Sequence, residues 1–490
     1  MPVFLSIDLG AGSGRVIAAE TDLKTLEFKE IHRFDNPGTD LPGGSFWNTV
    51  GLFRDIQEGI RLAVETYGDE IAAIGVDTWG CDHGFLDEHG RLLGLLHQYR
   101  DPRHESMPEK MHALMPEKEI YAHTGITTNF YNTSLHLLAE KTLGSPALAN
   151  AATLLFVPDL LAYWLCGEKA VERTVASTSQ LLDPRTGDWA WPVIDALGLP
   201  RRIFGKIVAP GTVLGPVREE VAAVIGRSGI PVVASASHDT ASAVAGIPMR
   251  DEDSLWLSCG TWSIMGLETQ SPILSDEAFA ARCCNELGVN GTVRFLKNIS
   301  GLWIIQECKR YWNGKGHPFS YADLAKLAAD APAFIAFIDP DDPVFASPGD
   351  MPKKIQAYCE RTGQTVPQTH GEILRVATES LALKYRVIYE KFCSLSGKRF
   401  PRLHIGGGGI QNEQLVQATA NALGIEVIAG PVEATSCGNV ITQMQAVGLL
   451  PSLAAGRELI QNSFAFRTYQ PKDAETWSTA YGKFLEVIGL

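Results

Sequence analysis

The stretch Phe4-Leu-Ser-Ile-Asp-Leu-Gly-Ala-Gly-Ser-Gly-Arg-Val-Ile-Ala-Ala19 places an aspartate and three glycines between two apolar runs. The run from Val16 to Ala19 is short, begins with two β-branched residues and ends at a polar triplet. This pattern predicts a second strand rather than a helix. The stretch is therefore expected to form a β-hairpin with the glycines at its tip.

Residues of this loop exclude two nucleotide-binding motifs. The dinucleotide-binding fingerprint needs G-x-G-x-x-G before a helix; Gly10 and Gly12 fit, but Arg15 takes the third glycine position. A P-loop needs G-x-x-x-x-G-K-[ST], which occurs nowhere in the chain. Two interpretations remain. One is an ordinary hairpin turn; the other is a phosphate-binding loop.

In the phosphate-binding interpretation, the glycines allow positive φ and close approach of the backbone. The N–H groups of Ala11 to Arg15 then form a concavity for anions. Asp8, at the end of the first strand, would hold Mg²⁺ or its water shell, because this cation prefers oxygen ligands.

The composition is that of a large globular protein. With 490 residues the chain exceeds the size of one growing core, so two domains are expected. Hydrophobic residues make up 45% and charged residues 20%, which argues against extensive disorder. The net charge of −14 disfavours nucleic acid and anionic membranes as partners. ATP remains possible as a ligand of this acidic protein, because Mg²⁺ and backbone N–H groups determine the electrostatic field at the binding site.

The cysteines and apolar segments indicate the cytoplasm. Nine cysteines occur without a CxxC or Cys/His cluster, which suits a reducing compartment, and Cys283-Cys284 is interpreted as two buried or semi-buried thiols. The N-terminus lacks the basic region of a signal peptide. The longest apolar segment, residues 151–166, is interrupted by Pro158-Asp159 and is too short to span a bilayer.

Two similar hairpins organise the chain. Strands are predicted at residues 3–8, 15–20 and about 26–34, followed by a helix over 50–67 and a strand over 71–77. Residues 253–268 again read as strand, small-residue turn and strand. This repetition about 250 residues apart suggests one domain type used twice.

The predicted fold class is α/β, with two actin-like ATPase (ribonuclease H-like) domains and a central catalytic cleft that holds nucleotide. The domains are expected at residues 1–245, with the first phosphate loop, and 246–455. Residues 456–490 are expected to pack on the second domain as an extension.

Asp239 is the candidate catalytic base. It lies where a buried strand, a polar break and a small-residue helix follow one another, and a helix N-terminus favours an ionised carboxylate. Such a carboxylate suits the removal of a proton from a sugar hydroxyl. The alternative is that Asp239 serves only as an N-cap. His238 and Thr240 add hydrogen-bonding groups that orient a polyol or stabilise a turn.

Four glycines, Gly406 to Gly409, follow a second buried strand, Arg402 to Ile405, and precede a helix expected from Gln411 to Leu423. They leave a backbone surface without side chains, against which a base or ribose would lie. A flexible connection between strand and helix is the alternative.

Eight segments in unbroken order resemble the successive motifs of the FGGY carbohydrate kinases, over residues 4 to about 440. They are Ile7-Asp-Leu-Gly-Ala-Gly-Ser-Gly-Arg15, Gly75-Val-Asp-Thr-Trp-Gly80, Tyr99-Arg-Asp-Pro-Arg103, Ser237-His-Asp-Thr-Ala-Ser-Ala243, Ser258-Cys-Gly-Thr-Trp-Ser263, Lys297-Asn298, Gly301-Leu-Trp303 and Gly407-Gly-Gly-Ile-Gln-Asn412.

The resemblance implies an ATP-dependent kinase that transfers the γ-phosphoryl group to a ketose, most closely L-rhamnulose at O1. It implies ATP and Mg²⁺ as cofactors, with Asp8 near the metal and Asp239 as the base. Implied sugar-binding residues are Gly80, Asp82, His238, Thr240 and Asn298. Implied nucleotide-binding residues are Ala11, Gly12, Ser13, Gly14 and Arg15 in the first domain and Thr261, Gln306, Gly407 and Gly408 in the second.

Two segments depart from the family pattern. After Gly80 the chain reads Cys81-Asp82-His83, where valine, aspartate and an aromatic residue are expected, and residues 127–133 also differ. Both belong to the sugar side, so L-fuculose or a pentulose stays open as the substrate. His83 would hydrogen-bond a sugar hydroxyl or serve as a structural residue.

A rival from another class is an actin-like nucleotide switch without sugar kinase activity. The His-Asp-Thr triplet at residues 238–240 disfavours it, because a switch needs no proton acceptor for a second substrate. The expected partners are a small sugar and ATP, with no nucleic acid and no membrane, and the protein is expected to be a monomer or homodimer.

Overall fold

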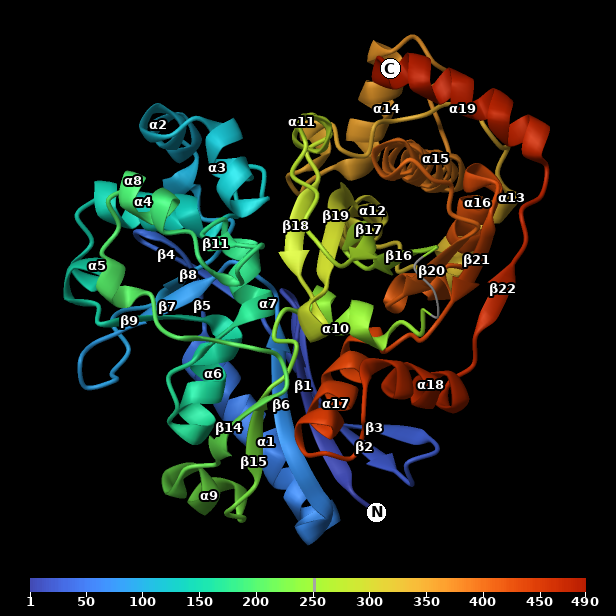
Figure 1. Ribbon diagram of the computed structural model, residues 1–490. Helices are drawn as coiled ribbons and strands as arrows, with labels where there is room; N and C mark the ends of the chain where they lie inside the picture. The colour runs from blue at the N-terminus through green and yellow to red at the C-terminus, as the bar shows by residue number, and fades with distance from the viewer. Residues whose placement is uncertain (250–252) are drawn as a thin grey trace. The chain divides into compact units, whose positions relative to one another are not determined.

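The computed structural model describes residues 1–249 and 253–490, which divide into two compact units (Figure 1). The first unit comprises Met1–Pro248, Glu268–Phe295 and Ala434–Phe464. The second comprises Met249–Leu267, Leu296–Glu433 and Ala465–Leu490. The domain boundaries at residues 245 and 455 stay predictions.

A six-stranded sheet forms the centre of the first unit, in the order β14-β15-β6-β1-β2-β3. Its strands β15, β6 and β1 are parallel, whereas β2, β3 and β14 are antiparallel to their neighbours. The bounds are β1 Val3–Leu9, β2 Ser13–Thr21, β3 Leu26–Asp35, β6 Ile71–Thr78, β14 Thr212–Pro216 and β15 Pro231–Ala234.

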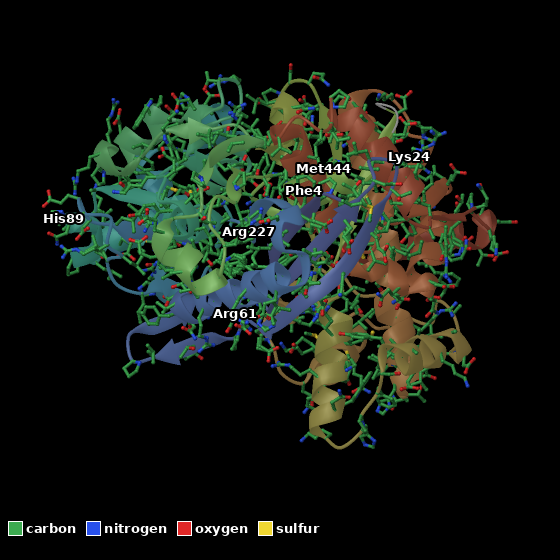
Figure 2. All side chains as sticks on the ribbon, turned by 90° about the horizontal axis from the view of Figure 1, so that it is seen from below. Phe4, Lys24, Arg61, His89, Arg227 and Met444 are labelled. Atoms are coloured by element: carbon green, nitrogen blue, oxygen red, sulfur yellow. The ribbon has the colours of Figure 1, made fainter. Side chains whose placement is uncertain are left out.

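The central strands form because they carry continuous apolar runs that are covered on both faces. Every residue of β1 is buried, as expected for a strand with parallel pairing in the middle of a sheet. Phe4 of β1 and Met444 of α17 (Ala434–Ala446), both labelled in Figure 2, are each fully buried. Helix α17 thus covers the sheet where β1 runs.

Two helices of the first unit meet at glycines. Helix α10 (Asp239–Gly246) packs on α17, and a Cβ at Gly438 would lie 1.8 Å from the Ser242 carbonyl oxygen. A Cβ at Gly246 would lie 2.0 Å from the Ala434 carbonyl oxygen. The backbones approach this closely only because neither residue has a side chain.

The remaining elements of the first unit surround the central sheet. Its further strands are β4 Gly38–Leu41, β5 Gly44–Trp47, β7 His83–Leu86, β8 Leu96–His97, β9 Thr153–Phe156, β10 Val171–Glu172, β11 Leu182–Asp183, β12 Asp188–Trp189, β13 Ile207–Val208 and β18 Cys284–Leu287. Its further helices are α1 Thr49–Tyr67, α2 Met107–Leu114, α3 Glu117–Thr124, α4 Thr133–Thr142, α5 Pro146–Asn150, α6 Val157–Cys166, α7 Arg173–Ala176, α8 Trp191–Ala196, α9 Glu219–Ile225, α11 Asp276–Ala280 and α18 Leu453–Ser463.

The second unit contains a mixed sheet in which β17, β16, β20, β21 and β22 pair in that order. Strands β16, β20 and β21 are parallel, and β17 and β22 are antiparallel to their neighbours. The bounds are β16 Ser254–Cys259, β17 Trp262–Thr269, β19 Val293–Ser300, β20 Arg402–Gly406, β21 Glu426–Ala429 and β22 Arg467–Tyr469; the last two residues of β17 and the first three of β19, up to Phe295, belong to the first unit. The helices are α12 Trp303–Gly314, α13 Tyr321–Asp330, α14 Met351–Arg361, α15 His370–Ser396, α16 Glu413–Leu423 and α19 Ala474–Ile488.

Both predicted hairpins are confirmed. Strands β1 and β2 pair antiparallel around the first glycine loop, and β16 and β17 pair antiparallel around the second small-residue turn. The α/β class, the helix predicted over 50–67 and the strand over 71–77 are confirmed as well. Cys283 and Cys284 are both buried, as predicted.

The expectation that the glycines of the first loop are needed for positive φ is wrong. Gly10, Gly12 and Gly14 are not among the glycines with positive φ. At Gly14 the requirement is space, because a Cβ there would lie 2.3 Å from the Phe34 ring and 2.5 Å from Leu9. Gly14 lies within strand β2, and only a glycine fits between the side chains of Phe34 and Leu9.

Candidate functional site

Three aspartates lie at the carboxyl ends of adjacent parallel strands in the first unit. Asp8 of β1 and Asp77 of β6 are direct register partners. Asp239 follows β15, and the chain before it is tied to β6 by a 2.9 Å hydrogen bond from the Thr78 N–H to the Ser237 carbonyl oxygen. Carboxyl ends of parallel strands meet at one edge, which is where α/β sheets bind ligands.

Asp8, the predicted metal residue, is buried and paired with an arginine of the next strand. Its Oδ2 accepts hydrogen bonds from Arg15 Nε at 3.1 Å and from the terminal guanidinium nitrogen at 2.7 Å. Asp8 and Arg15 are also opposite each other in the β1–β2 register. A predicted phosphate contact and the predicted metal residue are thus brought together.

The tip of the first loop presents unused backbone donors. Within the described part of the chain, the N–H groups of Ala11 and Gly12 have no hydrogen-bond partner, and both residues are exposed. The loop itself is held by Asn36, whose N–H donates to the Gly12 carbonyl oxygen and whose side chain donates to the Gly10 carbonyl oxygen. Ser13 and Gly14 already belong to β2.

Asp239 is the first residue of α10, and His238 occupies the N-cap position. Its Oδ1 accepts from the Thr240 N–H at 2.5 Å and from the Thr240 hydroxyl at 3.1 Å, and it lies 3.4 Å from His238 Nε2. Among the described residues, no hydrogen bond reaches Oδ2. The carboxylate therefore keeps one oxygen available for a substrate hydroxyl.

Burial raises the pKa of Asp239 above the ordinary aspartate value, and Asp8 adds to this effect. The neighbouring His238 and the Thr240 hydrogen bonds act on this pKa in the opposite direction. The side chain nevertheless keeps a third of its surface exposed. A carboxylate with a raised pKa is a stronger base than an ordinary one, which suits proton abstraction.

The turn that carries His238 and Asp239 is anchored by a buried glutamate, Glu172. Glu172 Oε2 accepts from the Ser237 N–H at 3.1 Å and from the Thr174 hydroxyl at 2.5 Å. The same Thr174 hydroxyl accepts from the His238 N–H at 3.2 Å. These bonds fix the backbone directly before the candidate base.

Two predicted sugar-binding residues, Gly80 and Asp82, follow β6. A Cβ at Gly80 would lie 2.9 Å from Thr178 Oγ1, so the chain passes close to this side chain. Asp82 is 1% exposed, and its Oδ2 accepts from the indole N–H of Trp47 at 2.6 Å and of Trp79 at 2.8 Å. Its Oδ1 has no hydrogen-bond partner in the described part of the chain.

The two segments that depart from the family pattern contact each other. The Thr133 hydroxyl donates to the Cys81 carbonyl oxygen at 2.6 Å. Thr178 accepts from the Cys81 N–H at 3.1 Å, and its carbonyl oxygen accepts from the Asn132 side chain at 3.3 Å. Because both segments pack on Thr178, a change in one is physically coupled to a change in the other.

Three buried histidines, His83, His104 and His136, form a cluster, and His136 lies beside Asp82. The rings of His104 and His136 are 4.5 Å apart, and His136 Nδ1 is 3.8 Å from Asp82 Oδ1. Burial lowers the pKa of His83 and of His104 to about 4, and it lowers that of His136 as well. These rings are therefore neutral at pH 7.

The stability of the protein is expected to depend on the protonation of Asp82. Burial raises its pKa to about 7, despite the indole hydrogen bonds that lower it. Between the unfolded value of 3.8 and this value, the folded state holds a proton that the unfolded state has released. The contribution of this bound proton to the free energy of unfolding is complete below pH 3.8 and is lost as the pH rises through 7.

Relative to an Asp82→Asn variant, the wild-type free energy of unfolding should therefore fall by about 1.4 kcal/mol per pH unit between about pH 4 and 7. Urea unfolding at several pH values measures this difference. Asp276→Asn, at an exposed position, serves as the control for the loss of one surface carboxylate. A flat difference for Asp82→Asn would contradict the buried, protonated carboxyl.

In the second unit, three segments that carry predicted nucleotide residues come together. The Thr261 carbonyl oxygen accepts from the Trp303 N–H at 3.1 Å, which joins the β16–β17 turn to the start of α12. Gly407 has a φ of 92°, and a Cβ there would lie 3.0 Å from the Cys259 carbonyl oxygen. Gln306 lies one turn into α12 and is partly exposed.

The glycine run after β20 leads directly into a short helical turn. Residues Gly408–Gln411 form a short 3₁₀ helix, and a Cβ at Gly409 would lie 2.2 Å from Cys259 Sγ. Gly408 is exposed, with no atom near its Cβ position. Asn298, predicted on the sugar side, is a partly exposed residue of β19.

The residues present are chemically suited to Mg²⁺ without forming a closed metal site. Among residues 1–249 and 253–490, no three His, Cys, Asp or Glu side chains are arranged to hold a metal ion. Asp8 and Asp239 nevertheless offer carboxylate oxygens at one sheet edge. Mg²⁺ in kinases is commonly held by one or two carboxylates together with substrate phosphates and water, so the donor set fits.

Four charged or polar residues of the site were missed by the sequence reasoning. Asp77 is fully buried; burial and Asp8 raise its pKa, and its Oδ2 accepts from Asn439 at 2.5 Å. Glu286 and Arg294 contact His238. Only Asp77 could have been found from the sequence, because it ends a predicted strand in the same way as Asp8.

No helix in the described ranges is long and apolar enough to cross a membrane.

Comparison with known proteins places both halves of the chain in one family. The N-terminal domain of the FGGY family of carbohydrate kinases matches residues 3–246, and the C-terminal domain matches residues 255–447. The rhamnulokinase of Bacteroides thetaiotaomicron is 41% identical over 485 residues, which cover 99% of each chain. The rhamnulokinase of Enterococcus faecalis is 39% identical, over 99% of this chain and 97% of that protein.

Solved structures share the fold at lower identity. Xylulose kinase from Lactobacillus acidophilus matches with a TM-score of 0.83 at 17% identity, over 100% of this chain and 98% of that chain. Glycerol kinase from Plasmodium falciparum, solved with ADP, gives a TM-score of 0.79 at 17% identity, over 99% of this chain and 98% of that chain. The predicted two-domain, actin-like ATPase fold is thereby confirmed. The chain belongs to the FGGY family of carbohydrate kinases.

Proposed function

We propose that the protein phosphorylates L-rhamnulose at O1 with ATP. Phosphoryl transfer to a hydroxyl is supported by the carboxylate of Asp239. Thr240 holds one of its oxygens, and the other is left available at the edge of the sheet. The substrate is proposed because rhamnulokinases are 35–41% identical over nearly the whole chain.

Asp239 Oδ2 would accept the proton of the attacking sugar hydroxyl as that oxygen bonds to the γ-phosphorus. General-base catalysis of this kind requires hydrogen-bonding contact between base and hydroxyl. The Thr240 donors and His238 hold Oδ1, so the carboxylate cannot rotate freely. The side chain is thereby presented in one orientation.

The first loop is proposed to bind the phosphates. The free N–H groups of Ala11 and Gly12 and the hydroxyl of Ser13 are suited to hold phosphate oxygens, and Arg15 adds a positive charge. Asp8 is proposed to hold Mg²⁺, directly or through water. When bound, Mg²⁺ neutralises charge on the transferring phosphoryl group.

The remaining roles are proposed by the family resemblance. Gly80, Asp82, His238, Thr240 and Asn298 would position the sugar. In the second unit, Thr261, Gln306, Gly407 and Gly408 would bind the nucleotide. The exposed glycine backbone supports this proposal, because it leaves room for a planar group.

ADP release by the purified protein with Mg-ATP, measured against L-rhamnulose, L-fuculose, L-ribulose, D-xylulose and D-fructose, tests the proposal. The highest kcat/KM is expected for L-rhamnulose. A higher value for another ketose would keep the reaction and change the substrate, a result for which the coupled departures at Cys81 and Thr133 offer a structural reason. ATP binding without sugar-dependent ADP release would favour a nucleotide switch.

A further inference from the structure

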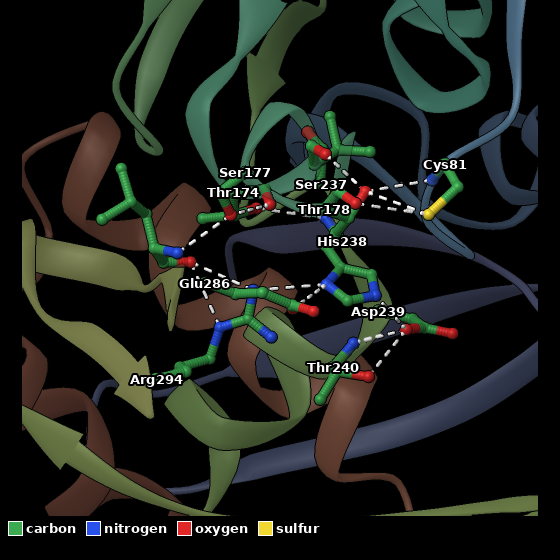
Figure 3. A network of polar contacts seen from close by, with 12 residues as sticks. Cys81, Thr174, Ser177, Thr178, Ser237, His238, Asp239, Thr240, Glu286 and Arg294 are labelled. Carbon is green, nitrogen blue, oxygen red and sulfur yellow. Dashed lines mark hydrogen bonds and ion pairs between the residues drawn. The ribbon is translucent and has the colours of Figure 1, made fainter. Parts of the chain in front are cut away.

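We propose that Arg294 and Glu286 are positioning residues that fix the tautomer of His238 and direct its Nε2–H toward the candidate base Asp239. All four residues lie in the first unit. Arg294 comes from β19 and Glu286 from β18, whereas His238 precedes α10 (Figure 3). The kinetic part of this inference rests on the proposed function, but the tautomer does not.

The hydrogens of Arg294 determine which nitrogen of His238 accepts. The guanidinium is fully buried, and one of its terminal nitrogens lies 3.1 Å from the Leu287 carbonyl oxygen and 3.2 Å from His238 Nδ1. Because arginine donates and never accepts, His238 Nδ1 is the acceptor in the second of these contacts. The Nε atom donates to the same Leu287 carbonyl oxygen at 3.1 Å.

Glu286 supplies the charge that keeps the buried guanidinium in place. Its Oε2 is 3.1 Å from the Arg294 terminal nitrogen and 3.3 Å from His238 Nδ1, and within the described part of the chain these two contacts are ion pairs rather than well-aligned hydrogen bonds. Burial opposes the ionisation of Glu286, yet Arg294 and His238 hold its pKa below the ordinary glutamate value. Glu286 thus acts as a counter-ion to Arg294.

The tautomer of His238 follows from these contacts. A neutral imidazole has one donor and one acceptor nitrogen, and the bond made by one nitrogen sets the role of the other. Because Nδ1 accepts from Arg294, Nε2 carries the proton. Nε2 lies 3.4 Å from Asp239 Oδ1, so its N–H faces a carboxylate oxygen. The opposite tautomer would set a lone pair against that oxygen.

The fixed tautomer of His238 would hold the carboxylate of Asp239 in the orientation that catalysis needs. With Nε2–H and both Thr240 donors directed at Oδ1, negative charge is held on that oxygen and Oδ2 remains for the sugar hydroxyl. Loss of the fixed tautomer would let the His238 ring turn and the carboxylate rotate. The expected defect is therefore in kcat, whereas ATP binding does not involve these groups.

The test measures the ring nitrogens of His238 by NMR on ¹⁵N-histidine-labelled protein, with His238→Gln identifying the resonances. In the wild type, Nε2 is expected to be protonated and Nδ1 unprotonated at pH 8. A double variant, Glu286→Leu with Arg294→Met, removes both charges and so leaves no unpaired buried ion. It should show a mixture of tautomers and a kcat lowered about 10-fold to 100-fold, with KM for ATP within about twofold.

A matched control removes another buried ion pair of the same unit, Arg103 with Glu140, by Arg103→Met and Glu140→Leu. It should leave the His238 resonances unchanged. A wild-type His238 protonated at Nδ1 overturns the inference, as does a double variant whose kcat falls while its tautomer stays fixed. A tautomer change in a protein without kinase activity on any ketose would uphold the inference and refute the proposed function.

Discussion

Asp239→Asn is expected to lower kcat for ketose phosphorylation about 1,000-fold. An asparagine keeps the Thr240 hydrogen bonds to its amide oxygen but places an NH₂ group, which cannot accept a proton, where Oδ2 stands. General-base catalysis contributes typically 10²-fold to 10⁴-fold, so the loss should fall in this range. ADP release under saturating ATP and sugar measures it.

The same variant should bind ATP with nearly wild-type affinity, which calorimetry checks. Asp276→Asn, at an exposed surface position, should behave as wild type. If Asp239→Asn kept full activity, another group would be the base, and the geometry of Oδ2 would have no catalytic meaning.

Gly438→Ala is expected to reduce the free energy of unfolding by about 3 kcal/mol. Its Cβ would lie 1.8 Å from the Ser242 carbonyl oxygen and 2.9 Å from the Gly246 backbone nitrogen. Backbone on both sides cannot move aside as a flexible side chain would, so helices α10 and α17 must separate. Because α10 begins with Asp239, kcat should also fall.

Gly482→Ala provides the control for this prediction. Gly482 lies inside α19, with no atom within 4 Å of its Cβ position, so alanine should stabilise that helix by about 0.5 to 1 kcal/mol. Urea unfolding compares both variants with the wild type. A Gly438→Ala variant as stable as Gly482→Ala would show that the contact between α10 and α17 is not tight.

The sequence was sufficient for the parts of the fold that depend on local pattern. The alternation of apolar residues and glycines around Asp8 predicts the first hairpin, and the small-residue turn near Cys259 predicts the second. Helix α1 and strand β6 follow from periodicity alone. These elements are specified by residues that are neighbours in the chain.

The environment of the candidate base could not be predicted in the same way. Arg294 and Glu286 reach His238 from strands about 50 residues later, and Asn439 reaches Asp77 from a helix 362 residues later. Such contacts depend on how the elements pack, which no local pattern encodes. The glycine loop shows the same limit: the pattern suggested positive φ, whereas packing against Phe34 is what requires Gly14.

The identity of the product tests the central claim most directly. The protein is mixed with Mg-ATP and L-rhamnulose, and ADP and all phosphorus species are quantified by ³¹P NMR, with ¹³C coupling to locate the new ester. The account predicts one phosphomonoester at O1 for each ADP, and almost none with Asp239→Asn. ADP accompanied by inorganic phosphate, or an ester at another carbon, would contradict it.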